Sequence, residues 1–261
     1  MCIRDSDRDG SGCSVIYSHE ASGRTGPTIE FIDRTPKVGA DGLYYGIVDN
    51  FGGFDNRLPS GRSIMAFDKD GNFVNYIFTQ PADSPSLRFR TGLTRHSNGL
   101  FYGIAANSQT AAVYDFTPDV GTRIVAYLPT DLASAGSGNV ELAEGPDGRL
   151  YGTSDGGANG FGAVFAVTTS GEIEKIHDFG GNDGAFPRIP VAFTPDGTMT
   201  VASSVLGELG GGSFMQFKGI AQAPVDEVQP TPLPTPTSSP TPVNPSPTVA
   251  PTTVEDGSDA S

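Results

Sequence analysis

Polar, charged and aromatic side chains gather in glycine-rich stretches that lie between apolar, strand-like segments. Phenylalanine rings in such loops can stack on sugar rings or seat a peptide. Carboxylate, amide and guanidinium groups beside them can supply hydrogen bonds. Binding residues concentrate on long loops held by a rigid scaffold. The candidate ligand-binding residues are Asp49, Phe51, Asp55, Asn56, Arg57, Asn107, Asp155, Asn159, Phe161 and Asp183.

The same loops have a simpler interpretation, in which glycine serves loop geometry and the acids serve solubility. Acidic, glycine-rich loops could also hold Ca²⁺ through oxygen ligands. Asp5, Asp7, Asp9 and Gly10 begin an EF-hand-like pattern, but its twelfth position is Ile16 where a bidentate acid is needed. We therefore expect no cofactor and no metal ligands.

No residue set is marked for catalysis. Hydrolysis needs a nucleophile with a base and an orienting group, or two opposed carboxylates. The histidines His19, His96 and His177 occupy different positions of the repeat described below, and Cys2 and Cys13 show no metal-ligand spacing. The catalytic residues stay unknown, and the sequence leans away from an enzyme.

A tandem repeat must position these loops. An Asp-Gly or Asn-Gly pair is followed by aromatic residues and a glycine in three copies, and the turn glycines of the four copies, Gly42, Gly99, Gly148 and Gly197, are 57, 49 and 49 residues apart. Such pairs favour two-residue hairpin turns. The fourth copy has decayed, with Val201 and Ala202 in place of Tyr-Gly.

Alternating apolar segments surround each turn, such as 63–67, 112–116, 163–167 and 213–217. A strand introduced by proline precedes the turn in most copies, and a second turn leads to a further strand. Four strands per unit in an up-and-down order is typical of a propeller blade. A β-sandwich lacks this regular repetition, and the rungs of a parallel β-helix are usually shorter.

The phasing predicts where each group lies. Loops between the second and third strands share a face with the connections between blades, and the Asp-Gly hairpins lie on the opposite face. The recurring tyrosines Tyr45, Tyr102 and Tyr151 are predicted to pack between blades, although they could line a ligand channel.

The third unit carries a resemblance to a known family. It runs from Asp147-Gly148-Arg149-Leu150-Tyr151-Gly152 through Gly162-Ala163-Val164-Phe165 to His177-Asp178-Phe179 and Asp183-Gly184-Ala185-Phe186-Pro187. This pattern resembles the GloVer-type tandem repeat. The resemblance covers about residues 13–217 and implies propellers on secreted or cell-surface proteins with varied anchoring tails. It brings no catalytic residues.

Composition narrows the partners. The net charge is −14 with no basic stripe, which argues against nucleic-acid binding. The chain has no apolar run long enough to span a membrane and no visible signal peptide. From residue 221 onward proline alternates with Thr, Ser and Val, which is typical of a disordered, extended stalk.

The termini suggest a fragment. Residues 1–9 are expected to be extraneous or disordered, because residues 1–6 resemble a translated sequencing adapter. The predicted organisation is then a repeat domain over 10–220 and a Pro/Thr/Ser-rich stalk over 221–261. Residues 13–18 read as an outermost strand that could close a four-bladed ring with the fourth unit, although a piece of a larger ring fits as well.

The sequence therefore predicts an all-β chain, a propeller or partial propeller of about four four-stranded blades followed by a disordered Pro/Thr-rich tail. Its expected function is that of an extracellular or bacterial cell-surface binding module for a glycan or protein ligand, tethered through the C-terminal stalk. An extracellular carbohydrate-active hydrolase or lyase and a structural spacer in an envelope protein remain alternatives.

Overall fold

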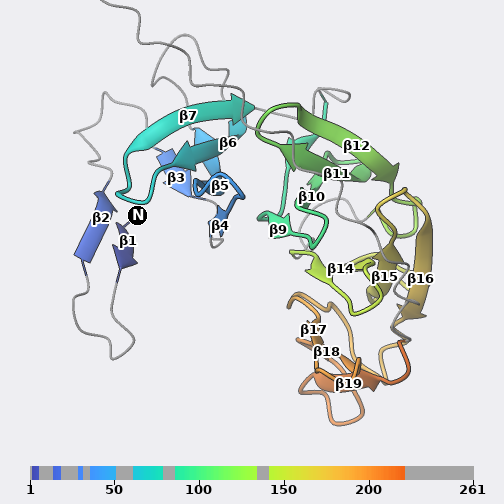
Figure 1. Cartoon of the computed structure of the whole chain (residues 1–261). Coiled ribbons are helices and arrows are strands. Elements are labelled where there is room, and N and C mark those ends of the chain that lie inside the picture. The colour runs from blue at the N-terminus through green and yellow to red at the C-terminus, as the bar shows by residue number, and fades with distance from the viewer. Residues whose placement is uncertain are drawn as a thin grey trace, which may run out of the picture. The chain divides into compact units, whose positions relative to one another are not determined.

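The computed structural model describes residues 2–5, 14–18, 29–31, 36–50, 61–78, 86–133 and 141–220. Within these residues the structure is all-β, without a helix. The strands follow the repeat, so that four antiparallel sheets succeed one another along the chain (Figure 1). We call these sheets, with their loops, the first to fourth units.

The first unit is a sheet in the order β3-β5-β6-β7, with β4 paired to β5. The second has the order β8-β10-β11-β12, with β9 paired to β10. The strand bounds are β3 Ile29–Phe31, β4 Lys37–Val38, β5 Tyr44–Asn50, β6 Gly61–Phe67, β7 Phe73–Phe78, β8 Arg88–Phe89, β9 Thr94–Arg95, β10 Phe101–Ala106, β11 Ala111–Thr117 and β12 Gly121–Tyr127.

The third unit has the order β13-β14-β15-β16, and the fourth has three strands in the order β17-β18-β19. Every pairing is antiparallel between strands joined by a short connection, which is the up-and-down order of a propeller blade. The bounds are β13 Ala143–Glu144, β14 Leu150–Ser154, β15 Ala163–Val167, β16 Ile173–Asp178, β17 Ala192–Phe193, β18 Met199–Ser203 and β19 Ser213–Phe217.

The hairpins at the repeated Asp/Asn-Gly pairs differ from the two-residue turns predicted. In the third unit the amide of Gly145 donates to the carbonyl of Arg149, and the amide of Gly148 donates to the carbonyl of Gly145. The loop therefore has three residues, and Gly148 has a φ of +74°, which disfavours any side chain. The same two bonds recur in the other three units. Asp and Asn occupy the position before that glycine, where their side chains accept a backbone amide.

The core lies between neighbouring sheets. Tyr45 of the first unit packs on Phe101 and Phe116 of the second, with ring centroids 5.4 and 5.5 Å apart. Tyr102 packs among Leu150 and other residues of the third unit. Tyr151 contacts Phe193 of the fourth unit at 5.0 Å. The predicted packing of these tyrosines between blades is confirmed.

Burial distinguishes the fourth sheet from the second and third. Strands β10, β14 and β15 are buried at every position, because neighbouring sheets cover both of their faces. In β18 and β19 burial alternates: Met199, Val201 and Met215 face the third unit, whereas Phe214 and Gln216 are exposed. The fourth sheet thus has one open face.

The N-terminal residues form a separate pair of strands. Strand β1 (Cys2–Asp5) pairs antiparallel with β2 (Ser14–Ser18). Residues 1–9 were expected to be extraneous or disordered, and β1 lies within them with its backbone paired to β2. Strand β2 contains the segment expected to extend the fourth sheet, and its partner here is β1.

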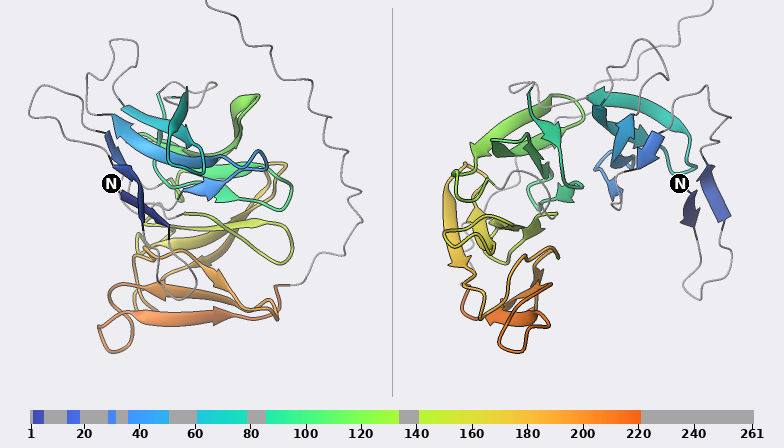
Figure 2. Two further views of the ribbon diagram at one scale, coloured as in Figure 1. Left: turned by 60° about the vertical axis from the view of Figure 1, so that its left-hand side comes forward. Right: turned by 180° about the vertical axis from the view of Figure 1, so that it is seen from behind.

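The predicted stalk lies outside the described residues. Figure 2 shows the sheets from two further sides. In the third and fourth units the β14–β15 loop, the β16–β17 connection and the β18–β19 loop lie at one end of the strands, and the hairpin turns at Gly148 and Gly197 lie at the other. We call these ends the loop side and the turn side. The chain is an all-β assembly of propeller-type sheets.

Candidate functional site

The loop side of the third and fourth units holds four of the predicted ligand-binding residues. Asp155 begins the β14–β15 loop and accepts hydrogen bonds from Arg188, at 2.9 Å from Nη2 and 3.2 Å from Nε to Oδ2. The Asp155 side chain is only 8% exposed, while that of Arg188 is 50% exposed. Arg188 also lies over the ring of Phe186, 5.4 Å from its centroid. The pair ties the loop to the β16–β17 connection.

Asn159 and Phe161 bind the same connection. The side-chain amide of Asn159 donates to the carbonyl of Phe179 at 3.0 Å. The carbonyl of Phe161 accepts the amide of Phe186 at 2.7 Å. Phe186 has a φ of +52°, unusual for a residue with a side chain, so this bond and the Arg188 contact hold a strained backbone.

Asp183 lies in the β16–β17 connection and joins three segments. Its Oδ2 accepts a hydrogen bond from Nε2 of His177 at 2.7 Å, and its Oδ1 accepts the amide of Gly180 at 2.7 Å. Its carbonyl accepts the hydroxyl of Ser213 in β19. Burial acts to raise the pKa of Asp183, but the bonds from Gly180 and His177 outweigh it and lower that pKa. Asp183 is therefore held as a carboxylate.

Asn107 closes the β10–β11 turn. Its side-chain oxygen accepts the amides of Gln109 and Thr110, both at 2.8 Å, and its amide reaches Ser86 in the connection before the second unit at 3.5 Å. This contact places the turn and the connection on one side of the sheet, as predicted. Phe51, Asp55, Asn56 and Arg57 lie outside the described residues, and for Asp49 in β5 only the backbone is described.

Apolar side chains accompany these residues on the loop side. Phe161 and Leu206 both lie within about van der Waals distance of a Cβ built at Gly181, which places them next to each other. Val205 forms an isolated bridge with Ala185. We call the exposed aliphatic residues of this region the loop strip. It consists of Ile189, Val205, Leu206 and Leu209, and Leu209 is 98% exposed.

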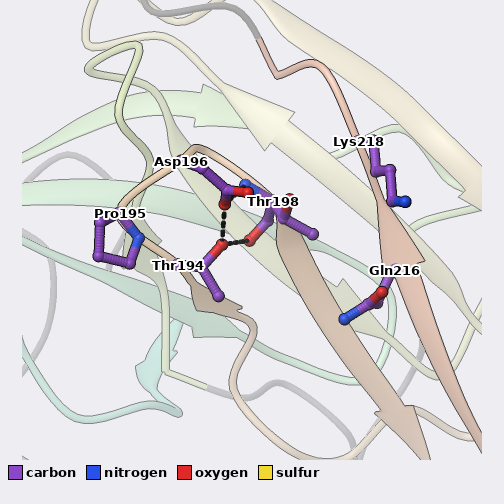
Figure 3. Close-up of a pocket in the computed structure, with 6 residues that line it drawn as sticks. All are labelled: Thr194, Pro195, Asp196, Thr198, Gln216 and Lys218. Atoms are coloured by element: carbon purple, nitrogen blue, oxygen red, sulfur yellow. Dashed lines mark hydrogen bonds between the residues drawn. The ribbon is translucent and has the colours of Figure 1, made fainter.

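A pocket lies at the other end of the fourth sheet, on the turn side (Figure 3). Its volume is about 460 Å³. Asp196 is held in place by two threonines: its Oδ1 accepts the hydroxyl of Thr194 and, at 3.1 Å, the amide of Thr198. Gln216 and Lys218 project from β19 and the residue after it. The lining residues are Thr194, Pro195, Asp196, Thr198, Gln216 and Lys218.

The first and third units show what normally fills this position. The turn aspartate accepts the hydroxyl of a tyrosine four residues later: Tyr45 to Asp41 at 2.5 Å and Tyr151 to Asp147 at 2.7 Å. In the second unit the amide of Asn98 donates to the hydroxyl of Tyr102 at 2.9 Å. We call this pair the turn–tyrosine lock.

The strand register identifies the equivalent residue of the fourth unit. Tyr151 pairs with Ala166, and Thr200 pairs with Gln216. The sequence alignment put Val201 in the tyrosine position, and this is wrong by one residue. Val201 packs toward the third unit, whereas Thr200 lies on the open face of the fourth sheet.

A second replacement accompanies the first. The tyrosine ring lies against the residue two before the turn aspartate, since a Cβ on Gly145 would be 2.5 Å from Cε2 of Tyr151, and one on Gly39 would be 2.7 Å from Cε2 of Tyr45. The equivalent residue of the fourth unit is Thr194, which lines the pocket. The pocket thus lies next to the position that a tyrosine fills in the other units, and it is lined by Thr194 and Gln216, the equivalents of Gly145 and Ala166.

Burial and hydrogen bonds at the turns shift the pKa values of the turn aspartates and of Tyr151. Burial raises the pKa of Tyr151, and the bond to Asp147 raises it further. For Asp147, burial acts upward, but hydrogen bonds from Tyr151 and Arg149 lower its pKa. Hydrogen bonds from Thr194 and Thr198 lower the pKa of Asp196. The pocket therefore contains a fixed carboxylate.

Sequence reasoning missed the pocket residues. The signal that could have revealed them lies in the fourth copy of the repeat. Two of its positions differ together from the third copy: Thr194 stands in place of Gly145, and Thr200 in place of Tyr151. The histidines took structural roles in the described region: Nε2 of His96 donates to the carbonyl of Gly148 at 2.9 Å, and His177 binds Asp183. Within the described ranges, three or more His, Cys, Asp or Glu side chains nowhere gather as a metal site.

The fold and these sites define a propeller-type repeat protein. No protein-family model matches the chain, and no curated protein sequence matches it. Among solved structures, a luciferin-regenerating enzyme is similar with a TM-score of 0.48 and 14% identity, covering 81% of this chain and 67% of that enzyme. A protein from Lactobacillus plantarum has a TM-score of 0.46 and 19% identity, covering 82% of this chain and 63% of its own.

An exo-beta-1,3-galactanase from Clostridium thermocellum is also similar, with a TM-score of 0.45 and 14% identity over 76% of this chain. The chain spans 48% of the galactanase, about half its length. No helix among the described residues is long and apolar enough to cross a membrane.

Proposed function

We propose that the chain is an extracellular or cell-surface binding module, whose recognition surface is the loop side of the units and whose Pro/Thr-rich segment acts as a tether. The observation that carries this proposal is the loop strip. Leu209 is 98% exposed, and Val205 and Leu206 are exposed in the same β18–β19 loop. Ile189 is exposed in the β16–β17 connection, which the Ala185–Val205 bridge joins to that loop. Exposed apolar groups gathered in one region are typical of interaction sites.

The loops that carry the strip are already fixed. The amide of Gly207 donates to the carbonyl of Gly181 at 2.8 Å, and the hydroxyl of Ser204 donates to the carbonyl of Phe186 at 3.0 Å. Leu206 has a φ of +61°, a second strained position in this region. A partner that covers the strip would order few new groups, so most of the gain from burying the aliphatic side chains remains as affinity.

Two acids near the loop side, Asp178 and Asp183, favour binding over hydrolysis. Asp183 and Asp178 both have lowered pKa values: for Asp178 the bond from Lys175 lowers it first, and burial opposes this. A glycosidase needs one carboxyl group whose pKa is raised, so that it is protonated and can act as an acid. The two carboxylates are instead engaged by His177 and Lys175.

The first unit extends this proposal. Asp49, Phe51, Asp55, Asn56 and Arg57 occupy the same position of the repeat as the third unit's loop, so we propose them as further ligand contacts. A glycan or a protein segment with apolar groups is the ligand class that these side chains fit.

The test is a binding screen of the 261-residue chain on glycan and peptide arrays. We expect specific binding that Leu209→Ser and Leu206→Ser weaken at least tenfold. Val120→Ser is the matched control, because Val120 is 88% exposed but lies on a turn between β11 and β12. Equal losses in all three variants, the absence of any bound glycan or peptide, or release of galactose from β-1,3-galactan would overturn the proposal.

A further inference from the structure

The pocket on the turn side of the fourth unit is open to solvent, and its chemistry differs from that of the equivalent positions in the other units. In the third unit the equivalent space holds the ring of Tyr151 over Gly145, with Ala166 as the cross-strand partner. In the fourth unit these three positions are Thr194, Thr200 and Gln216. The third unit fills this position with an aromatic ring, whereas the fourth unit has open space there with polar side chains around it.

The lining of the pocket includes both hydrogen-bond donors and hydrogen-bond acceptors. Asp196 is an acceptor fixed by Thr194 and Thr198, and the single hydroxyl proton of Thr194 is shared between Asp196 and the carbonyl of Thr198, which lies 3.1 Å away. Gln216 can donate and accept, and Lys218 can donate. Figure 3 shows Gln216 and Lys218 across the cavity from Asp196 and Thr198. A ligand here meets acceptors on one wall and donors on the other.

Apolar surface lies beside these groups. The ring of Pro195 forms part of the lining. Phe214 is 71% exposed and lies on the open face of β19, two residues before Gln216. Two residues along a strand span about 7 Å, roughly the width of one sugar ring. An exposed ring at this distance from a polar pocket can stack on a sugar whose hydroxyls enter the pocket.

We propose that this pocket binds a neutral, hydroxyl-rich ligand, namely one or two sugar residues of a glycan. Adjacent hydroxyls can donate to Asp196 and accept from Gln216 and Lys218, and the apolar face of the ring can pack on Pro195 or Phe214. The lining carries one carboxylate, Asp196, and one ammonium group, Lys218, so its charges balance and favour a neutral ligand over an anionic or cationic one. A cavity of about 460 Å³ lies within the range of small-ligand sites.

The site goes beyond the proposed function, because it lies at the opposite end of the fourth sheet from the loop strip. Each can fail without the other. Loss of the pocket leaves the loop strip intact, and Leu209→Ser leaves the pocket intact.

The experiment is saturation-transfer difference NMR of the full chain with methyl β-D-galactopyranoside, methyl β-D-glucopyranoside and methyl α-D-mannopyranoside. For single sugars we expect a dissociation constant on the order of 1 mM. Gln216→Ala and Asp196→Asn should each weaken binding about tenfold, and Leu209→Ser should leave it unchanged.

The double variant Thr194→Gly/Thr200→Tyr rebuilds the turn–tyrosine lock and fills the cavity. We expect it to remain folded and to lose the saturation transfer. No transfer from the native chain to any of the three glycosides would overturn the proposal. Transfer that persists at native strength in Gln216→Ala and Asp196→Asn would overturn it as well, even if the double variant failed to fold.

Discussion

The hydroxyl of Tyr151 donates a hydrogen bond to Oδ2 of Asp147, with 2.7 Å between the two oxygens. The Asp147 side chain is only 7% exposed and also binds Arg149 at 2.6 Å. The bond therefore joins a hairpin turn to the core between the third and fourth units. It recurs in the first unit, between Tyr45 and Asp41.

Removing this hydroxyl should weaken the fold. Tyr151→Phe keeps the ring packing but leaves Asp147 with one donor fewer, so we expect a loss of about 1–2 kcal/mol in the free energy of unfolding. Urea denaturation followed by tyrosine fluorescence measures it. Tyr127→Phe, at a half-exposed position of β12, should change stability by less than about 0.5 kcal/mol. Equal stability of Tyr151→Phe and the native chain would show that the bond contributes nothing.

The space beneath the tyrosine gives a second prediction. Gly145→Ala places a Cβ 2.5 Å from Cε2 of Tyr151 and close to Asp147, so the ring must move. We expect destabilisation by about 1–3 kcal/mol. Gly211→Ala is the control, because a Cβ there meets nothing within 4 Å and its φ is not positive. Thermal unfolding of the two variants should separate them, and similar melting temperatures would contradict the proposed clash.

Acid should weaken the connection that Asp183 holds. Because its folded-state pKa lies below the unfolded value, Asp183 stabilises the fold fully above the unfolded pKa of about 4. That contribution is lost as the pH falls through the lower, folded-state pKa. The difference in unfolding free energy between the native chain and Asp183→Asn should therefore shrink as the pH is lowered from 6 to 3.

The control for this pH series is Asn182→Ala, which removes an exposed neutral neighbour. Its stability difference from the native chain should stay constant over the same range. A pH-independent difference for Asp183→Asn would mean that its carboxylate does not contribute through ionisation.

Arg188 should stabilise the fold mainly by donating hydrogen bonds to the buried carboxylate of Asp155. Arg188→Ala leaves the 8%-exposed side chain of Asp155 without this donor, so we expect a loss of about 1–3 kcal/mol. Arg95→Ala, at an exposed position of β9, should lie within about 0.5 kcal/mol of the native chain. Chemical denaturation measures both. If the pair of Arg188 and Asp155 contributed no more than an exposed surface ion pair, the two variants would have the same unfolding free energy.

Much of the fold could be predicted because its signals are local. The turn glycines and the period-two apolar segments located β6, β11, β15 and β19 within a residue or two. The short strands β4 and β9 were missed, since two-residue pairings such as Thr94–Arg95 with β10 depend on the partner strand more than on their own sequence. The length of the hairpin loops was also misjudged, because Asp-Gly fits a two-residue turn as well as the end of a three-residue loop.

The candidate sites were predictable in part. The sequence indicated that the β14–β15 loop and the β16–β17 connection share a side, and the bonds of Asn159 and Asp155 confirm it. It could not show that Arg188, 33 positions away, would donate hydrogen bonds to the carboxylate of Asp155. The pocket was hidden because it arises where a side chain is missing, and such a space is visible only once the strand register shows which face Thr200 occupies.

The turn–tyrosine lock is short enough to be rebuilt or dismantled within a single unit. Its members are four residues apart, and each unit of the first three contains its own copy. An array with this redundancy can give up one lock while the others keep their sheets together. The fourth unit has Thr200 at the position of that tyrosine, so a stabilising contact of the other units is replaced there by open space.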